Sequence, residues 1–455
     1  MTLSTLKRND LTRGPILKKL LVIAVPIMGT QFMQMSYNLT DMFWLGRVGP
    51  NAVAASGTAG MFMWLSMAFL MVGRMGAEIG VAQCFGSGDP SRASDFSVNA
   101  MRTGFALGLA YALILVAFRE ILVGFFNIQE PAVAEDTRTY LAVVAAAMPL
   151  NFVSASLTGS FNGSGNSRTP FIANAIGLIT NIILDPICIY QLNLGVIGAA
   201  VATLVSQCVV FTVIIYAMKR SRNRPFETYA IWGKPDYTIL RQIFRWTTPI
   251  MLESLLFTLM AMVTTRFVNG FGANAMAASR VGSQVESLSW LIGGGFGSAL
   301  TAFMGQNCGA GRWSRIRSGF RISSWVMILY GTVITLVLLL LAGYFYDLFL
   351  PNEPFIRRMG TDYLSIIAIC QIPQCLEAVA GGTLKGIGKT MPPSVISIST
   401  NVIRVILAYF LSITALGLNG IWVAVTITAS ARGLGMFLYY LLTRKTRPAE
   451  DLANG

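Results

Sequence analysis

The chain has 455 residues, of which 54% are apolar and only 12% are charged, and its mean hydropathy is +0.61. A soluble protein carries about twice this share of charged residues, so the composition excludes an ordinary soluble domain and predicts an integral membrane protein. The net charge of +14 comes without a soluble basic domain or an aromatic–basic patch, which argues against nucleic-acid binding.

Apolar stretches of about 20 residues recur along the chain, and each is long enough to cross about 30 Å of hydrocarbon. Such segments must be helical, because lipid offers no hydrogen-bond partner to an open backbone. We predict twelve spans, centred near residues 28, 66, 107, 147, 179, 206, 256, 293, 332, 368, 402 and 432. The first begins after Lys19 without a small-residue cleavage site, so we expect it to be retained as a membrane helix.

The sequence contains two copies of one unit, separated by 223 positions. The motifs that recur at this offset are Pro26 as Pro249, Gly49 as Gly272, Gln83-x-x-Gly86-x-Gly88 as Gln306-x-x-Gly309-x-Gly311, and Gly163-x-Gly165 as Gly386-x-Gly388. Since each copy holds six spans, both insert with the same orientation and form a parallel repeat, as in transporters that move one half against the other. We therefore predict an N-terminal six-helix lobe (1–219), a cytoplasmic inter-lobe linker (220–237) and a C-terminal six-helix lobe (238–455).

Lys and Arg gather on one side of the predicted spans: at the N-terminus, in the linker, in the loop after the eighth span and in the tail. The positive-inside rule places this side, with both termini, in the cytoplasm. The six cysteines follow neither a disulfide nor a zinc spacing. The chain has no histidine, so any proton chemistry must use carboxylates.

Two aspartates lie inside predicted spans of the N-terminal lobe, and their repeat partners are uncharged. Asp41 is on the first span and Asp185 on the fifth, where Asn181 shares its helix face at a spacing of four. Thr203 follows on the sixth span. If these helices meet, the oxygen set suits Na⁺. It equally suits H⁺, because burial and a like-charged neighbour both favour a protonated carboxyl. The other interpretation is that nearby amides merely cap each aspartate.

Three glutamates of the C-terminal lobe also break the repeat: Glu253, Glu286 and Glu377 on the seventh, eighth and tenth spans. With Tyr37, we predict that they form a substrate site or a second ion site, because ionisable groups inside spans are costly and functional by default. Arg404, on the eleventh span, is a candidate partner for one of them in a structural ion pair. No nucleotide-binding motif is present, so transport must draw on an ion gradient.

Pro26 lies early in the first span, where proline removes a helix hydrogen bond and bends the helix. It is a candidate hinge for transport. A static kink that helps packing is the alternative.

The order of these motifs on twelve spans resembles the multidrug and toxic compound extrusion (MATE) family. The segments that carry the resemblance are Asp41 with Leu45-Gly46, the paired Gln-x-x-Gly-x-Gly segments, Gly163-x-Gly165-x-x-x-x-Pro170, Asn181-x-x-x-Asp185-Pro186 and Gln374-x-x-Glu377. The resemblance implies two helical bundles and export of cationic, lipophilic compounds in exchange for H⁺ or Na⁺. It implies that the coupling ion binds Asp41, Asn181, Asp185 and Thr203, which are metal ligands only if that ion is Na⁺. Other members carry an aspartate where Glu377 stands.

We thus expect an all-α secondary transporter that works by alternating access, with no enzymatic activity and no cofactor besides the coupling ion. We expect a monomer in a bacterial cytoplasmic membrane that contacts cationic drugs and lipids, but no nucleic acid and no obligate protein partner. The nearest alternative is a flippase for lipid-linked saccharides or other amphipathic lipids. An intramembrane aspartyl protease leaves the duplication unexplained, and a passive channel fits poorly with two differently charged lobes.

Overall fold

The computed structural model describes residues 10–126, 128, 130–220, 225–226, 229, 233–351 and 353–443, and this part of the chain is helical without a strand. The helices are α1 (Ile16–Val48), α2 (Pro50–Gly86), α3 (Pro90–Ala117), α4 (Arg119–Gly124), α5 (Pro131–Gly163), α6 (Arg168–Pro186), the π-helix η1 (Ile187–Gln191), α7 (Gly195–Arg220), α8 (Tyr237–Asn269), α9 (Ala273–Gly309), α10 (Trp313–Phe349), α11 (Pro354–Ala368), α12 (Gln371–Gly386), α13 (Met391–Ser412) and α14 (Leu418–Thr443). The predicted linker, 220–237, lies largely outside the described residues.

Within the described residues, eleven helices are long and apolar enough to cross a membrane. α11 and α12 meet at a bend of 44°, and counted together as one broken span they bring the number to twelve. The predicted all-α membrane fold is therefore confirmed, with the tenth span broken.

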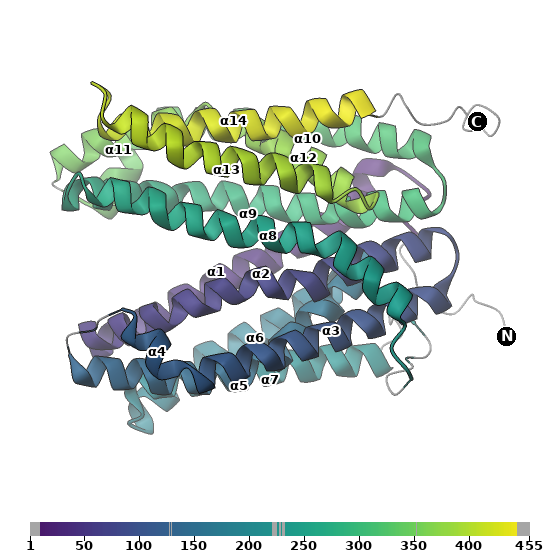
Figure 1. Cartoon of the computed structure of the whole chain (residues 1–455), viewed down its shortest axis with the longest axis horizontal. Coiled ribbons are helices and arrows are strands. Elements are labelled where there is room, and N and C mark those ends of the chain that lie inside the picture. Colours follow the sequence, from purple (N-terminus) through teal and green to yellow (C-terminus); the bar gives the residue numbers. More distant parts are fainter. Residues whose placement is uncertain are drawn as a thin grey trace.

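The helices form two bundles, with α1–α7 in one and α8–α14 in the other (Figure 1). We call them the N-lobe and the C-lobe. In the N-lobe α2 packs on α5, and in the C-lobe α9 packs on α12, so equivalent helices of the two repeats make equivalent contacts. The start of α1, the end of α14, and the ends of α7 and α8 next to the linker lie at the same end of the molecule (Figure 1).

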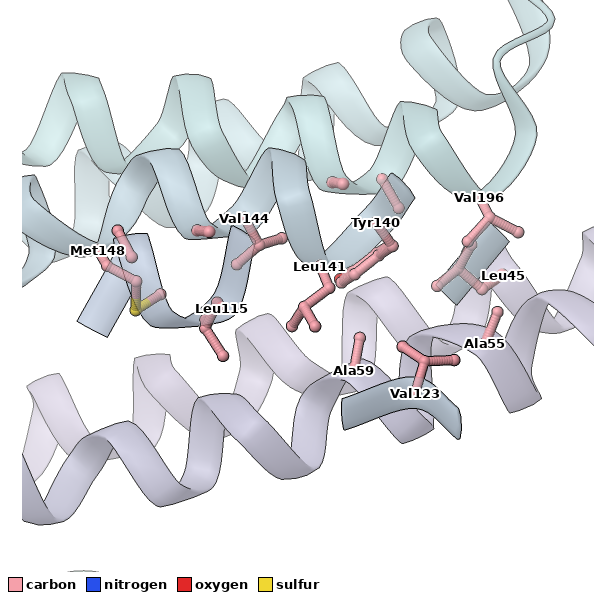
Figure 2. Close-up of a cluster of buried hydrophobic side chains, with 14 of the residues drawn as sticks. Leu45, Ala55, Ala59, Leu115, Val123, Tyr140, Leu141, Val144, Met148 and Val196 are labelled. Carbon is pink, nitrogen blue, oxygen red and sulfur yellow. The ribbon is translucent and has the colours of Figure 1, made fainter. Parts of the chain in front are cut away.

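A buried apolar cluster fills the N-lobe between α1, α2 and α5 (Figure 2). Leu45 of α1, Ala59 of α2 and Leu141 of α5 are 0–1% exposed. Packing of this kind is the main force that joins helices in lipid, where no hydrophobic drive acts between them. Leu45 lies one helical turn beyond Asp41, so the cluster fixes the part of α1 that carries this carboxyl.

The two lobes are joined at one end of the molecule by a symmetric pair of hydrogen bonds. Gln83 Nε2 of α2 donates to the carbonyl of Gly386 in α12 at 3.0 Å, and Gln306 Nε2 of α9 donates to the carbonyl of Gly163 in α5 at 2.8 Å. The two donors are repeat partners of each other, and so are the two acceptors. We call this region the closed end.

Close backbone contact at the closed end requires glycine. A Cβ atom added at Gly86 would clash with the carbonyl of Gln306, and one added at Gly309 would clash with the carbonyl of Gln83. The repeated Gln-x-x-Gly motif therefore lets α2 and α9 cross with their backbones touching.

The segment before α1 is bound to the C-lobe at the closed end. The amide of Leu11 donates to Gln306 Oε1 at 3.1 Å, and the carbonyl of Leu11 accepts from Asn307 Nδ2 at 3.3 Å and from Arg315 Nε at 3.2 Å. The carbonyl of Thr12 accepts from Arg312 Nη1 at 2.6 Å. Leu11 itself is fully buried. We call this segment, residues 10–15, the N-terminal strap.

The repeated Gly-x-Gly segments terminate helices. α5 ends at Gly163 and α12 at Gly386, and the next glycine of each pair is left-handed, with φ +83° at Gly165 and φ +77° at Gly388. Glycine adopts this conformation without strain, so it commonly follows a helix end.

Candidate functional site

The four predicted ion-site residues of the N-lobe converge from three helices. α1 supplies Asp41, α6 supplies Asn181 and Asp185, and α7 supplies Thr203. Asn181 Nδ2 donates to Asp185 Oδ1 at 3.1 Å, and both side chains are fully buried. Asp41 lies close enough to Asp185, Asn181 and Thr203 to interact with all three. We call these four residues the carboxylate pair site.

The carboxylate pair site has more acceptor oxygens than donors. Asp41 Oδ1, Asp185 Oδ2 and Asn181 Oδ1 are buried and accept no hydrogen bond. Buried acceptors without a donor are rare and costly, and a cation among them would satisfy all three. In the described part of the chain, no Lys or Arg forms an ion pair with either aspartate. No cluster of three metal-ligating His, Cys, Asp or Glu occurs there either, so Na⁺ would need amide and hydroxyl ligands as well.

Tyr37 lies with the carboxylate pair site and not with the C-lobe glutamates. It precedes Asp41 by one helical turn, and its buried hydroxyl has no hydrogen-bond partner, like that of Thr203. The structure therefore separates Tyr37 from the acids with which the sequence grouped it.

Two residues near this site were missed by sequence reasoning. Tyr140 of α5 is 7% exposed and interacts electrostatically with both aspartates. Ser206 follows Thr203 by three positions on α7 and lies beside Tyr37. The spacing of Ser206 offered a signal because residues three apart share a helix face. Tyr140, in an apolar run, offered none.

The backbone is irregular directly after the buried aspartate. Pro186 ends α6 next to Asp185, and the chain continues as the π-helix η1. Proline removes the hydrogen bond to the carbonyl four residues earlier. Short π-helical turns frequently occur at functional sites, where they re-aim the side chains beside them.

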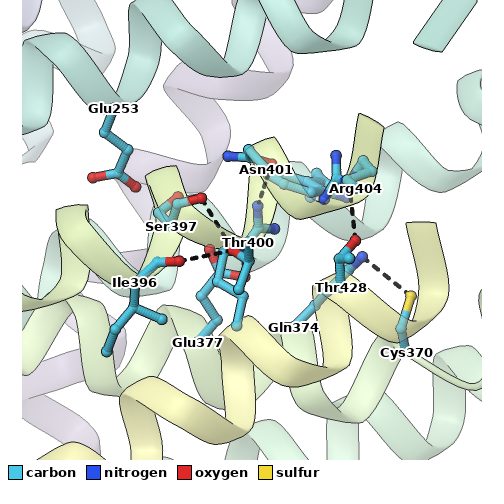
Figure 3. Close-up of polar contacts among 12 residues, drawn as sticks. Glu253, Cys370, Gln374, Glu377, Ile396, Ser397, Thr400, Asn401, Arg404 and Thr428 are labelled. Carbon is cyan, nitrogen blue, oxygen red and sulfur yellow. Dashed lines mark hydrogen bonds and ion pairs between the residues drawn. The ribbon is translucent and has the colours of Figure 1, made fainter. Parts of the chain in front are cut away.

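The C-lobe acid Glu377 is neutralised by a residue that the sequence analysis did not name. Arg432 Nε of α14 donates to Glu377 Oε2 at 2.7 Å, and Arg432 is 2% exposed. Arg404, the expected partner, instead donates from Nε to Thr428 Oγ1 at 3.2 Å (Figure 3). An Arg inside a membrane span is itself a signal of function or pairing, so Arg432 was detectable from the sequence.

The other two glutamates lie in separate surroundings. Glu253 of α8 accepts from Ser394 Oγ at 2.8 Å and lies 3.8 Å from Lys385 Nζ. It stands at the edge of the polar cluster in Figure 3. Among the described residues, Glu286 of α9 accepts hydrogen bonds from neutral groups: Trp290 Nε1 and Tyr363 OH, both at 3.2 Å, and Gln374 Nε2 at 3.5 Å. Glu286 and Glu377 both lie within electrostatic range of Arg404, whereas Glu253 is held by Ser394 and Lys385.

Pro26 lies inside α1, which continues as one helix on both sides of it. Its carbonyl accepts a hydrogen bond from Thr30 Oγ1 at 3.0 Å. Because proline has no N–H, the carbonyl of Val22 loses its helical partner, and this point of α1 lacks one of its hydrogen bonds.

Relatives with assigned names match nearly the whole chain. A protein of Thermotoga maritima named "Probable multidrug resistance protein NorM" is 25% identical over 433 residues, which is 94% of this chain and 92% of the relative. A protein of Bacillus subtilis named "Probable multidrug resistance protein YoeA" is 25% identical over 445 residues, 96% of each.

Solved structures share the fold. A crystal structure of "MATE in the bent conformation" matches with a TM-score of 0.91 at 23% identity, covering 97% of this chain and 98% of that one. The "outward-facing conformation of a multidrug resistance MATE family transporter of the MOP superfamily" matches with a TM-score of 0.90 at 22% identity, covering 98% of this chain and all of the other.

The family model named MatE matches this chain twice, over residues 26–187 and 249–410. The two matches fall on equivalent parts of the N-lobe and the C-lobe, as the internal repeat requires. The chain is therefore a multi-pass integral membrane protein that belongs to the MatE family of transporters.

Proposed function

We propose that the protein exports amphipathic cationic compounds across a bacterial cytoplasmic membrane in exchange for H⁺ or Na⁺, and that the coupling ion binds the carboxylate pair site. The relatives named as multidrug resistance proteins support drug export, and the resemblance to the MATE family implies that the drugs are cationic.

The observation that carries the proposal is the difference in charge between the lobes. Asp41 and Asp185 face each other without a basic partner, whereas Glu377 and Glu253 are each paired with a cation of their own lobe. An unneutralised pair of carboxylates inside a membrane requires a proton or a metal cation. This contrast favours the N-lobe over the C-lobe as the main ion site.

The proposed transport cycle depends on the need of the carboxylate pair for a cation. Binding of the cation neutralises the carboxylate pair site, which removes the repulsion between Asp41 and Asp185 and lets α1 move relative to α6. Drug and ion must then favour opposite states of the two lobes, because coupling is a difference in affinity between states and not a property of one contact.

The test is ethidium efflux from proteoliposomes under a proton gradient and, separately, under a Na⁺ gradient. We expect one gradient to drive efflux and Asp41→Asn to abolish it with normal membrane insertion. Asp347→Asn is the matched control, because Asp347 makes an exposed ion pair with Arg357. Full activity of Asp41→Asn would disprove the role of the pair, and no efflux under either gradient would disprove the antiport.

A further inference from the structure

The exposed surface of the N-lobe carries a groove between the first half of α1 and the start of α6. Its volume is about 1020 Å³, at the upper end of the size range of sites that hold a whole ligand. Leu17, Leu21 and Val25 of α1 line the groove at a spacing of four, so they share one helix face. Phe171 of α6 packs over Gly29, where an added Cβ atom would clash with the phenyl ring. Apolar side chains therefore form most of the wall.

The charges that line the groove are all positive. Lys18 of α1 and Arg168 of α6 take part in the lining, and none of the lining residues is acidic. Both cations are exposed, and within the described residues neither forms an ion pair. Arg168 is also the first residue of α6, where the helix dipole adds positive charge. This part of the groove therefore attracts an anion.

The two cations lie toward the closed end of the molecule, and apolar residues follow them. α6 begins at the closed end because α5 ends there, and α1 begins at the same end (Figure 1). Along α1, Lys18 comes before Val25. Along α6, Arg168 comes before Ile172. The positive-inside rule assigns this end to the cytoplasm, so the groove runs from a charged cytoplasmic mouth into an apolar interior.

The exposed apolar side chains of the groove face the membrane. Gln83 and Gln306 join the lobes at the closed end, so no open space between the lobes reaches this surface there. Val25 is 60% exposed and Ile172 is 53% exposed. A phospholipid has the same order of chemistry, with a phosphate followed by apolar tails. Basic pockets between membrane helices on the cytoplasmic side bind the head groups of anionic lipids.

The C-lobe does not repeat this lining. At the offset of 223, Met391 stands in place of Arg168. Ser394 stands in place of Phe171, and its hydroxyl donates to Glu253 at 2.8 Å. The cation and the aromatic wall of the groove therefore belong to the N-lobe alone, and the fold that the two repeats share does not require them.

We propose that the groove between α1 and α6 binds an anionic phospholipid of the cytoplasmic leaflet, with its phosphate on Lys18 and Arg168 and one acyl tail along Val25. Val22 and Pro26 also line the groove, so the tail covers the point at which α1 lacks one hydrogen bond. The lipid would then have to move whenever α1 bends at Pro26. This site is separate from the carboxylate pair site, and it does not depend on the proposed export function.

The experiment is native mass spectrometry of the purified full-length protein, titrated with phosphatidylglycerol or with phosphatidylcholine of the same acyl chains. We expect the wild type to bind its first phosphatidylglycerol about tenfold or more tightly than its first phosphatidylcholine. Lys18→Gln with Arg168→Gln should weaken the phosphatidylglycerol event about thirtyfold and change phosphatidylcholine binding much less. Arg241→Gln is the matched control, because Arg241 is the exposed repeat partner of Lys18 and should leave both affinities unchanged.

Ile172→Trp tests the apolar wall, because it fills the groove and keeps both cations. We expect it to weaken phosphatidylglycerol binding as well, and it serves if the double variant does not fold. Val395→Trp, at the equivalent exposed position of α13, is its control. Equal affinities of the wild type for the two lipids would overturn the proposal. Unchanged phosphatidylglycerol binding in the double variant or in Ile172→Trp would do the same. The measurement needs no ion gradient, so its outcome is independent of the antiport.

Discussion

The charged side chains inside the membrane differ in what surrounds them, and this difference matters more than their number. The carboxylate pair site joins two acids with no base, whereas Glu377 shares one hydrogen-bonded pair with Arg432. The first arrangement would change its charge on binding the proposed coupling ion. The second is balanced at rest and stays so unless one partner is removed.

Removing one member of the C-lobe pair should therefore destabilise the protein. Glu377→Gln leaves Arg432 buried without its carboxylate, and we expect a loss of about 1.5–3 kcal/mol, seen as a lower temperature of thermal aggregation. The double variant Glu377→Gln with Arg432→Gln should recover most of this loss, because it leaves no unpaired charge. A double variant as unstable as the single one would contradict a charge-pair origin.

The charged and polar residues inside the spans show how much of the site can be predicted from the sequence. Asn181 and Asp185 were placed together because residues four apart share a helix face. The pairing of Arg432 with Glu377 joins positions 55 apart on two helices, and periodicity gives the faces of helices without saying which faces meet. Arg404 was the reasonable choice from the sequence, but its guanidinium bonds to the next helix instead.

Among the helices, the tenth span departs most from expectation. A single apolar run centred near residue 368 predicts one helix, but α11 ends at Ala368 and α12 begins at Gln371 with a bend of 44°. Pro373 is the third residue of α12, a position in the first turn that tolerates proline because those N–H groups have no helical partner. The break was thus present in the sequence, but hydropathy averages over it.

α1 carries both Asp41 of the carboxylate pair site and the hinge candidate Pro26. We expect Pro26→Ala to stiffen α1 by restoring a hydrogen bond, and so to slow drug efflux several-fold while equilibrium drug binding changes little. Proteoliposome efflux rates and dye-binding constants measure the two effects. Pro249→Ala, at the equivalent position of α8, is the matched control, because α8 carries no part of the carboxylate pair site. Equal slowing by both substitutions would contradict a special role of Pro26.

For the whole molecule, the closed end matters most, because the same motif of each repeat binds the opposite lobe there. Gln83 and Gln306 donate to main-chain carbonyls. Substituting a side chain of the partner lobe therefore does not remove the acceptor. The two hydrogen bonds exist only while the lobes touch at this end. They therefore stabilise the observed state relative to any state in which this end is open.

Removing both donors should shift the balance between these states. Two hydrogen bonds contribute about 1–3 kcal/mol together, so Gln83→Ala with Gln306→Ala should change the ratio of closed to open molecules by about 5–150-fold. Hydrogen–deuterium exchange of the touching backbones around Gly86 and Gly309 reports the opening. Gln284→Ala, at an exposed position on α9, is the control. Unchanged exchange around Gly86 and Gly309 in the double variant would contradict a role of these bonds in closure.

The N-terminal strap affects how α1 can move. The strap is fastened to the C-lobe by Leu11 and Thr12, whereas the far part of α1 carries Asp41 among the helices of the N-lobe. α1 has 33 residues and is about 50 Å long, and Pro26 lies about 22 Å before Asp41. A tilt of about 10° at Pro26 would then carry Asp41 sideways by about 4 Å, which is more than the length of a hydrogen bond. α1 would thus transmit movement between its base, which is bound to the C-lobe, and Asp41 in the proposed ion site of the N-lobe.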